Sequence, residues 1–302
     1  MHRFAVTLIL ACVEYCKSAS AWLKRIAAAL LAIAWGIADP SDLTALSLRY
    51  WETDPDWEEA AMLGGCYPWE EAVYAAHLPS HGRIGLIGCG AGRDVLALAR
   101  QGHAVEGVDV SNKLIQAARR YCSQAQVDAE LFCADVRAFE FPKEAYDAFI
   151  FSNFTYGYLP GSLQRVRILK RLRRKLAPDG RVILFYYKMP HRQDGRLNRL
   201  ARWTARLMRT PNPPEPGDRL DLDYQFQHVF VQDEITREAA QAGYELLEVG
   251  PLAHQWDFAV ILSRAETRIT VASGVGAALP NNKEVLGRSN TSNPRRILAC
   301  SP

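Results

Sequence analysis

Three glycines at alternating positions, Gly88, Gly90 and Gly92, form the most chemically suggestive part of the sequence. They follow a short apolar run, residues 84–87, and precede a helical pattern. Because glycine has no Cβ, it lets the backbone turn sharply and approach a ligand closely. A dinucleotide fingerprint would need its third glycine at the position of Arg93. The spacing therefore indicates a ligand-binding turn that is not of the common dinucleotide type.

Two acidic residues follow the next two predicted strands. Asp109 stands at the end of the second strand, where a carboxylate can accept hydrogen bonds from both hydroxyls of an adenosine ribose. Asp135 follows the third strand, where the same cleft would hold the edge of an adenine. Alone, each acid also fits a helix N-cap or an ordinary loop position. Together, in register with the strands, they favour a nucleoside site.

Two more residues are candidates for catalysis. His228 lies in the segment 226–230, and the unperturbed pKa of histidine suits a general base. Tyr156 lies in the segment 151–158, which leaves the carboxyl end of the fourth strand and is expected to line the pocket of a second substrate. The alternatives are a hydrogen-bonded structural histidine and a packing tyrosine. No metal site is predicted.

The elements that position these residues alternate between short β-rich runs and helical patterns, as in βαβ units. The loop between the last two strands has only about eight residues, too few for a helical crossover, so the last strand is expected to be antiparallel. The sequence predicts an α/β, three-layer Rossmann-like sandwich with a mostly parallel seven-stranded sheet, preceded by N-terminal helices. The predicted strands are residues 84–87, 104–110, 130–133, 146–151, 181–187, 244–249 and 258–262.

The chain divides into three predicted parts. Residues 1–80 form an N-terminal helical cap, residues 81–263 form the α/β domain, and residues 264–302 form a disordered tail rich in Ser, Asn, Gly and Pro. The segment 189–224 is too long for a simple connection and is predicted to be an inserted lid. Within it, arginines recur every three or four residues from Arg196 to Arg209, which indicates a basic amphipathic helix.

The N-terminus contains two uncharged apolar runs, residues 4–13 and 26–38. Both are shorter than the roughly 18 to 20 residues that span a bilayer. They favour a pair of apolar helices that pack on the following domain, with a signal peptide or a peripheral membrane anchor as alternatives. The basic helix has two open roles: a lid over an anionic acceptor, or a membrane-surface contact made together with the N-terminus.

Composition excludes several classes of protein. With 302 residues, 49% of them hydrophobic, the chain can bury a hydrophobic core without the help of disulfides or structural metal ions. A net charge of +3 is too small for sequence-independent binding of nucleic acid. Seven scattered cysteines without a CxxC pair suit reduced thiols better than a disulfide framework or structural zinc. We therefore expect a cytoplasmic protein, with membrane association left open.

The segments GLIGCGAGRD, VEGVDVS, ADV and LRRKLAPDGRVIL together resemble the class I S-adenosylmethionine-dependent methyltransferases, over residues 80–263. The resemblance implies that the glycines face the methionine part of S-adenosylmethionine, that Asp109 binds the ribose and that Asp135 with Val136 binds the adenine. Many members carry an acid two positions before the first glycine, where this chain has Leu86. The cofactor's amino group then needs another partner, such as a backbone carbonyl. The implied cofactor-binding residues are Gly88, Cys89, Gly90, Gly92, Asp109, Val110, Asp135, Val136 and Asn153.

By this resemblance the function is methyl transfer to a small-molecule acceptor by in-line displacement, with S-adenosylhomocysteine as the product. A non-catalytic cofactor-binding or scaffold protein is an alternative, suggested by Leu86 and by the lack of a readable acid or base. A nicotinamide-dependent oxidoreductase is disfavoured by Arg93 and by the antiparallel last strand. The chain lacks the Pro-Pro-aromatic and Pro-Cys segments of DNA methylation, so no DNA partner is expected. Neither the acceptor atom nor the oligomeric state follows from the sequence.

Overall fold

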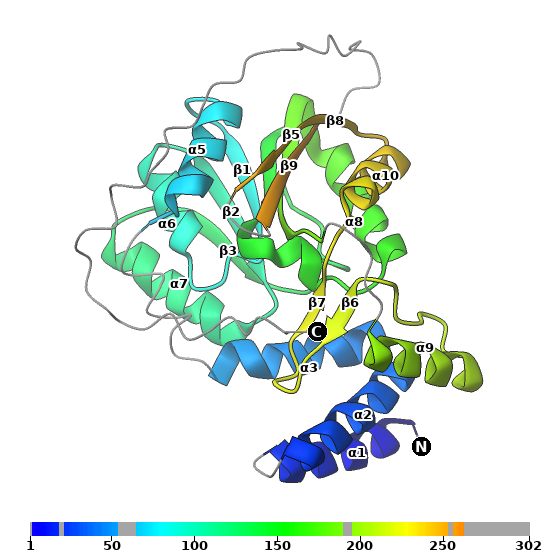
Figure 1. The fold of residues 1–302 in the computed structure, drawn as a ribbon. Coiled ribbons are helices and arrows are strands. Elements are labelled where there is room, and N and C mark those ends of the chain that lie inside the picture. Colours follow the sequence, from blue (N-terminus) through cyan, green and yellow to red (C-terminus); the bar gives the residue numbers. More distant parts are fainter. Residues whose placement is uncertain (1, 18–20, 54–64, 190–194, 253–255, 263–302) are drawn as a thin grey trace, which may run out of the picture. The chain divides into compact units, whose positions relative to one another are not determined.

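The computed structural model describes residues 2–17, 21–53, 65–189, 195–252 and 256–262 (Figure 1). Its centre is a seven-stranded sheet with the strand order β3-β2-β1-β4-β5-β9-β8. Only β9 runs against its neighbours, β5 and β8. The predicted mostly parallel sheet with an antiparallel last strand is thereby confirmed. The strands are β1 (Arg83–Ile87), β2 (Ala104–Asp109), β3 (Ala129–Cys133), β4 (Tyr146–Phe151), β5 (Leu176–Tyr187), β8 (Glu245–Pro251) and β9 (Trp256–Leu262).

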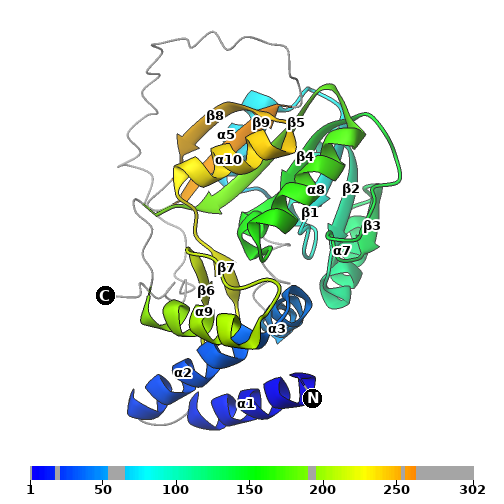
Figure 2. The same ribbon diagram turned by 90° about the vertical axis from the view of Figure 1, so that its right-hand side faces the viewer.

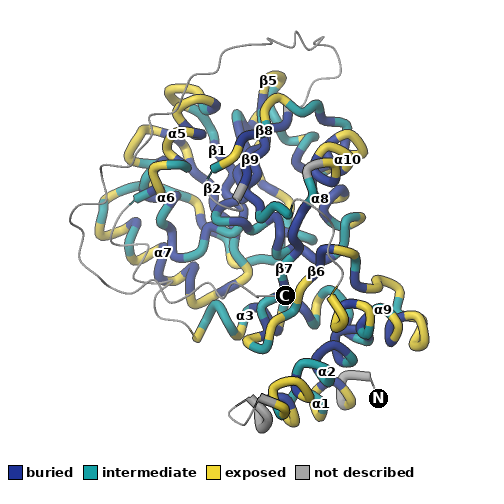
Figure 3. The backbone as a smooth tube through the Cα atoms, viewed as in Figure 1, coloured by how far each residue is buried: buried dark blue, intermediate teal, exposed yellow. Residues whose placement is uncertain are grey.

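The central strands are buried on both faces, so they read as continuous apolar runs rather than alternating ones. In β4, Phe149 and Phe151 point into one hydrophobic cluster, whereas Ala148 and Ile150 point into a second cluster on the other face. Figure 3 shows this burial along the strands of the sheet. Because each face carries its own core, the molecule needs a layer of helices on either side.

Helices supply those two layers. The first face is covered by α8 (Ser162–Lys175) and α10 (Gln232–Ala242), and the second by α5 (Pro68–His77), α6 (Arg93–Arg100) and α7 (Asn112–Gln124). The α7 helix begins after an N-cap serine, because the Ser111 hydroxyl accepts a hydrogen bond from the Leu114 amide at 3.2 Å. The three-layer sandwich is therefore present.

One boundary differs from the sequence prediction. The sequence predicts a strand over residues 181–187, but β5 already begins at Leu176 and includes the Pro178-Asp179-Gly180 segment. Leu176 pairs with Tyr146 and Arg181 pairs with Ala148, so the residues between them bulge out of register. Gly180 permits the bulge, since a Cβ there would lie 2.7 Å from the Tyr146 carbonyl oxygen.

The N-terminal apolar runs form helices that pack side by side (Figure 2). Helix α2 also packs on α9, with Gly36 so close that an added Cβ would lie 2.3 Å from the Ala201 carbonyl oxygen. None of the described helices has the length and apolar character needed to cross a bilayer. The helices concerned are α1 (His2–Lys17), α2 (Ala21–Ile37), α3 (Pro40–Thr53) and α9 (Arg196–Met208).

The segment after β5 contains α9 and a two-stranded antiparallel hairpin, β6 (Asp218–Leu220) with β7 (Phe226–His228). A short 3₁₀ segment, η1 (Ser152–Tyr158), follows β4. The predicted tail, residues 264–302, lies outside the described residues.

Candidate functional site

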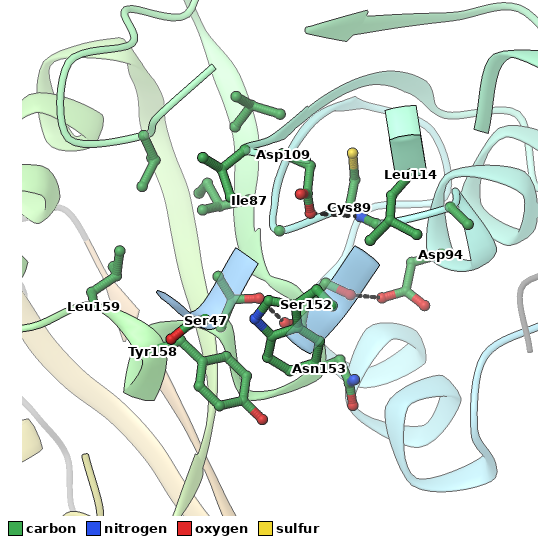
Figure 4. Close-up of a pocket in the computed structure, with 18 of the residues that line it drawn as sticks. Ser47, Ile87, Cys89, Asp94, Asp109, Leu114, Ser152, Asn153, Tyr158 and Leu159 are labelled. Atoms are coloured by element: carbon green, nitrogen blue, oxygen red, sulfur yellow. Dashed lines mark hydrogen bonds between the residues drawn. The ribbon is translucent and has the colours of Figure 1, made fainter. Parts of the chain in front are cut away.

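A cavity opens at the carboxyl edge of the sheet, beside the ends of β1, β2, β3 and β4 (Figure 4). The strand order β3-β2-β1-β4 places Asp135, Asp109, the glycine turn and Ser152 in a row along this edge. Open α/β sheets bind their ligands at such an edge. The structure brings eight of the nine predicted cofactor residues to the cavity wall: Gly88, Cys89, Gly90, Asp109, Val110, Asp135, Val136 and Asn153.

The three glycines of the turn all have backbone φ angles in the left-handed region, +72° at Gly88, +51° at Gly90 and +93° at Gly92. An added Cβ at Gly88 would lie 2.0 Å from the Thr155 hydroxyl oxygen, and one at Gly92 would lie 3.0 Å from the Ala118 Cβ. Nothing lies within 4 Å of the Cβ position of Gly90. Gly88 and Gly92 thus allow tight packing against neighbouring residues, whereas the backbone of Gly90 faces open space. This explains why Gly92 is absent from the wall.

Asp109 is fixed in place by the backbone. One carboxylate oxygen accepts a hydrogen bond from the Gly90 amide at 2.9 Å, and the other accepts from the Ser111 amide at 2.8 Å. Burial raises the pKa of this carboxyl, against the lowering effect of these amides. Each oxygen keeps a further lone pair for a ligand hydroxyl.

Asp135 is held by a different group, the Arg137 guanidinium. The Arg137 Nε donates to both carboxylate oxygens, at 3.0 and 2.8 Å. Burial opposes ionisation of Asp135, but the hydrogen bonds from Arg137 outweigh it and lower the pKa. Arg171 on α8 donates to the carbonyl oxygens of Val136 and Arg137 and so fixes the course of this loop.

The opposite wall comes from the N-terminal helix α3, a contribution that was not predicted from the sequence. Thr44, Ser47 and Trp51 line the cavity there, and the Trp51 ring meets the Tyr158 ring edge to face at 4.9 Å. Ser47 joins α3 to the hairpin, since its hydroxyl accepts from the Phe226 amide at 3.1 Å. No motif in residues 40–53 signals this role, because it depends on contacts with residues far along the chain.

A buried charged cluster borders the cavity next to β4. The Asp94 side chain is 1% exposed and accepts a hydrogen bond from the Ser152 hydroxyl, as Figure 4 shows. Arg93 lies 2.7 Å from Asp94 and forms two hydrogen bonds with Glu70 of α5. Burial, and then the negative charge of Asp94, raise the pKa of Glu70 to about 7. Asp94 belongs to the glycine-turn motif, yet the sequence alone did not assign it a role.

The two predicted catalytic residues are placed elsewhere. His228 is 1% exposed, with its Nδ1 atom 2.6 Å from an Asp218 carboxylate oxygen, and the Tyr156 hydroxyl donates to Glu238 at 2.5 Å. Both rings pack against Phe230 in the interior, and neither lines the cavity. The cavity wall as described therefore includes neither of the two residues predicted to be catalytic.

Within this interior network, burial lowers the pKa of His228, but its contacts with Asp218 and Glu234 have the larger effect and raise it.

The described part of the predicted lid lies away from the cavity wall. Helix α9 packs against α2, and among the described residues of the segment 189–224 none lines the cavity wall. The wall that a lid was expected to supply is formed by α3 instead.

Comparisons with known proteins agree with this geometry. Residues 86–180 match the family model described as a methyltransferase domain. No curated protein matches the chain. A solved S-adenosylmethionine-dependent methyltransferase from Methanosarcina mazei is 20% identical, with a TM-score of 0.51, over 66% of this chain and 98% of that one.

A second similar structure is the Burkholderia thailandensis 1,6-didemethyltoxoflavin-N1-methyltransferase with bound 1,6-didemethyltoxoflavin and S-adenosylhomocysteine. It is 15% identical, with a TM-score of 0.54, over 74% of this chain and 90% of that one. At these identities the solved structures show the fold, and the family model shows the domain. Residues 86–180 therefore form a methyltransferase domain, and the chain has the fold of the class I S-adenosylmethionine-dependent methyltransferases.

Proposed function

We propose that this protein binds S-adenosylmethionine in the cavity at the sheet edge and transfers the methyl group to a small-molecule acceptor. The observation that carries the proposal is the Asp109 carboxylate, which two backbone amides hold beside the open space at Gly90. A carboxylate fixed in this way is suited to accept hydrogen bonds from two neighbouring ribose hydroxyls.

The rest of the wall fits the two ends of such a cofactor. On the β3 side the lining includes Val110, Leu114 and Val136, whose apolar side chains suit a flat base. On the β4 side it includes Arg93, Asp94 and Ser152, whose polar groups suit an amino acid. This division supports a cofactor that lies along the sheet edge with its base toward β3.

The acceptor is proposed to bind between the cofactor and α3. When bound, S-adenosylmethionine supplies a methyl group on a sulfonium sulfur, which the acceptor atom attacks in line. The aromatic side chains of Trp51 and Tyr158 would hold the acceptor and exclude water, so positioning is the main contribution of the protein. A recessed cavity lined by single side chains favours a small molecule over a macromolecule.

The acceptor side of the described wall carries no carboxylate, histidine, lysine or arginine. The charged residues that line the cavity are Arg93, Asp94, Asp109 and Asp135, all on the cofactor side. Burial raises the pKa of Tyr158 well above its usual value, so its hydroxyl stays protonated. These observations support an acceptor atom that attacks without a protein base.

The proposal is tested by calorimetric titration with S-adenosylmethionine, S-adenosylhomocysteine and NADH. We expect the first two to bind, and Asp109→Ala to weaken them at least about tenfold, because a charge-assisted hydrogen-bond partner is lost. Asp128→Ala, which removes an exposed aspartate, is the matched control and should bind like the wild type. Binding of NADH alone, or of none of the three, would refute the cofactor assignment. Release of S-adenosylhomocysteine in an acceptor screen then separates an enzyme from a scaffold.

A peripheral membrane contact is a separate proposal, supported by the outer face of α9. Trp203 is 61% exposed and Leu207 is 65% exposed on a helix that also carries arginines. Exposed aromatic and basic residues on one helix are typical of interfacial binding. Co-sedimentation with anionic vesicles should be lost in Trp203→Ala, and failure of the wild type to sediment with them would exclude the contact.

A further inference from the structure

Leu86 occupies the position two residues before the first glycine, where many members of the family carry an acid. Its side chain is 0% exposed and packs in the apolar core between β1 and the helices α5, α6 and α7. It therefore offers no charge to a ligand. If the proposed function holds, the positively charged amino group of the cofactor must be met by another group of this chain.

The cluster beside the cavity contains more negative than positive charge. Glu70 and Asp94 are two buried carboxyls, and Arg93 is the one guanidinium that contacts both of them. The other groups that touch Asp94 are neutral, since burial and the charge of Asp94 raise the pKa values of the Cys66 thiol and the Tyr74 hydroxyl. Above the raised pKa of Glu70, which is about 7, both carboxyls are ionised and the cluster has one negative charge that Arg93 does not balance.

The position of this charge matches the end of the cavity where an amino acid would lie. Asp94 lines the wall next to Ser152, which follows β4, whereas Asp109 is the last residue of β2 and Asp135 follows β3. If Asp109 holds the ribose, one end of the nucleoside points toward β3 and the other toward β4. The apolar lining near β3 suits the base, so the amino-acid part is directed toward Asp94.

We propose that Asp94 supplies the negative charge that holds the ammonium group of the cofactor's methionine part, in place of the acid that is missing at Leu86. The assignment rests on the proposed function and deepens it. In a buried, water-poor setting an unbalanced carboxylate attracts a cation more strongly than it would at the surface. A metal ion is a poorer occupant, because Arg93 already lies against both carboxyls and the Cys66 thiol resists deprotonation.

The test compares two ligands that differ only in the amino-acid part. S-adenosylhomocysteine carries the ammonium group, and 5′-methylthioadenosine lacks the whole amino acid. We expect Asp94→Asn to weaken S-adenosylhomocysteine at least about tenfold while it changes the affinity for 5′-methylthioadenosine by less than about twofold. Normal binding of 5′-methylthioadenosine also reports that the variant is folded. Tyr74→Phe is the matched control, because it removes a neutral donor from the same carboxylate and keeps the charge.

A deaminated analogue of S-adenosylhomocysteine gives a readout in the unmutated protein. The affinity of the wild type for this analogue should be as low as the affinity of Asp94→Asn for S-adenosylhomocysteine. The Asp94→Asn substitution should not lower the affinity for the analogue any further. The assignment is overturned if Asp94→Asn keeps its affinity for S-adenosylhomocysteine, or if it loses both natural ligands equally. It is also overturned if the wild type binds the deaminated analogue as tightly as S-adenosylhomocysteine. If the wild type binds neither S-adenosylhomocysteine nor 5′-methylthioadenosine, the proposed function fails and the assignment fails with it.

Discussion

Glu70 makes the stability of this protein depend on pH in a direction opposite to that of a typical salt-bridged acid. Its side chain is 0% exposed, and burial together with the charge of Asp94 raises the pKa from 4.5 to about 7 despite the contact with Arg93. The folded protein therefore binds a proton more tightly than the unfolded chain does. Between pH 4.5 and 7 this proton is held by the folded state only, so stability falls as the pH rises through that window.

The size of the effect follows from the difference in pKa. A raised pKa of this size corresponds to about 3 kcal/mol of stability lost by pH 8 relative to pH 4, since each unit is worth about 1.4 kcal/mol. We expect urea unfolding of the wild type and of Glu70→Gln to show this, because glutamine cannot titrate. The free energy of unfolding of the wild type, minus that of Glu70→Gln, should fall by about 3 kcal/mol across the window.

A matched control exists on the same helix. Glu71 is exposed, so Glu71→Gln makes the same change of residue outside the buried cluster and is the variant with which Glu70→Gln is compared. If the difference for Glu70→Gln stayed constant, or rose with pH, then Arg93 would hold Glu70 ionised throughout. That result would refute the raised pKa of Glu70.

Three further changes test other parts of the structure. Gly88→Ala should lower the free energy of unfolding by about 2 kcal/mol or more, measured by urea unfolding, because it adds a Cβ at a left-handed φ against Thr155. Trp51→Ala should leave the affinity for S-adenosylhomocysteine unchanged and raise the KM for the acceptor, measured once an acceptor is known. Arg165→Met should cost about 3 kcal/mol or more in thermal or urea unfolding, since it leaves the buried Glu238 carboxylate without its cation.

Each of these variants has a control in the same chain. Gly195→Ala introduces a methyl group into open space at a negative φ and should be neutral. Trp203→Ala is the control for Trp51→Ala, because it removes an exposed tryptophan of α9 that lies outside the cavity wall. Arg167→Ala is the control for Arg165→Met, because it removes an exposed arginine of the same helix. Equal effects in variant and control would contradict the proposed cause in each case.

The part of the cavity wall that carries the predicted cofactor residues could be predicted from the sequence because its signals are local. A glycine turn between a strand and a helix, with acids after the next two strands, is set by backbone geometry within a few residues. The sheet topology then brings Asp109 and Asp135 together without further information. The antiparallel last strand was also predictable, since its connecting loop is short.

The side of the cavity formed by α3, where the acceptor is proposed to bind, could not be predicted from the sequence because it depends on contacts between residues far apart in the chain. The role of Trp51 is set by the docking of α3 beside η1, and the residue type alone does not reveal it. His228 has a side chain suited to a base, but its segment turns inward and pairs it with Asp218. Asp94 stands in a local motif, yet its charge matters only through Glu70, which α5 brings to the cluster.

The hydrogen bond between Ser47 and Phe226 joins residues 179 positions apart. On a ribosome, the N-terminal helices would emerge long before the segment on which they dock. Until then Trp35 of α2 would lack Phe226, its partner in the folded protein. The part of the wall that carries the predicted cofactor residues would be able to form first, and the nascent chain would meanwhile carry an uncovered apolar helix that chaperones recognise. Docking of α3 against the segment around Phe226, which completes the cavity wall, is thus expected to occur late in synthesis and folding of the chain.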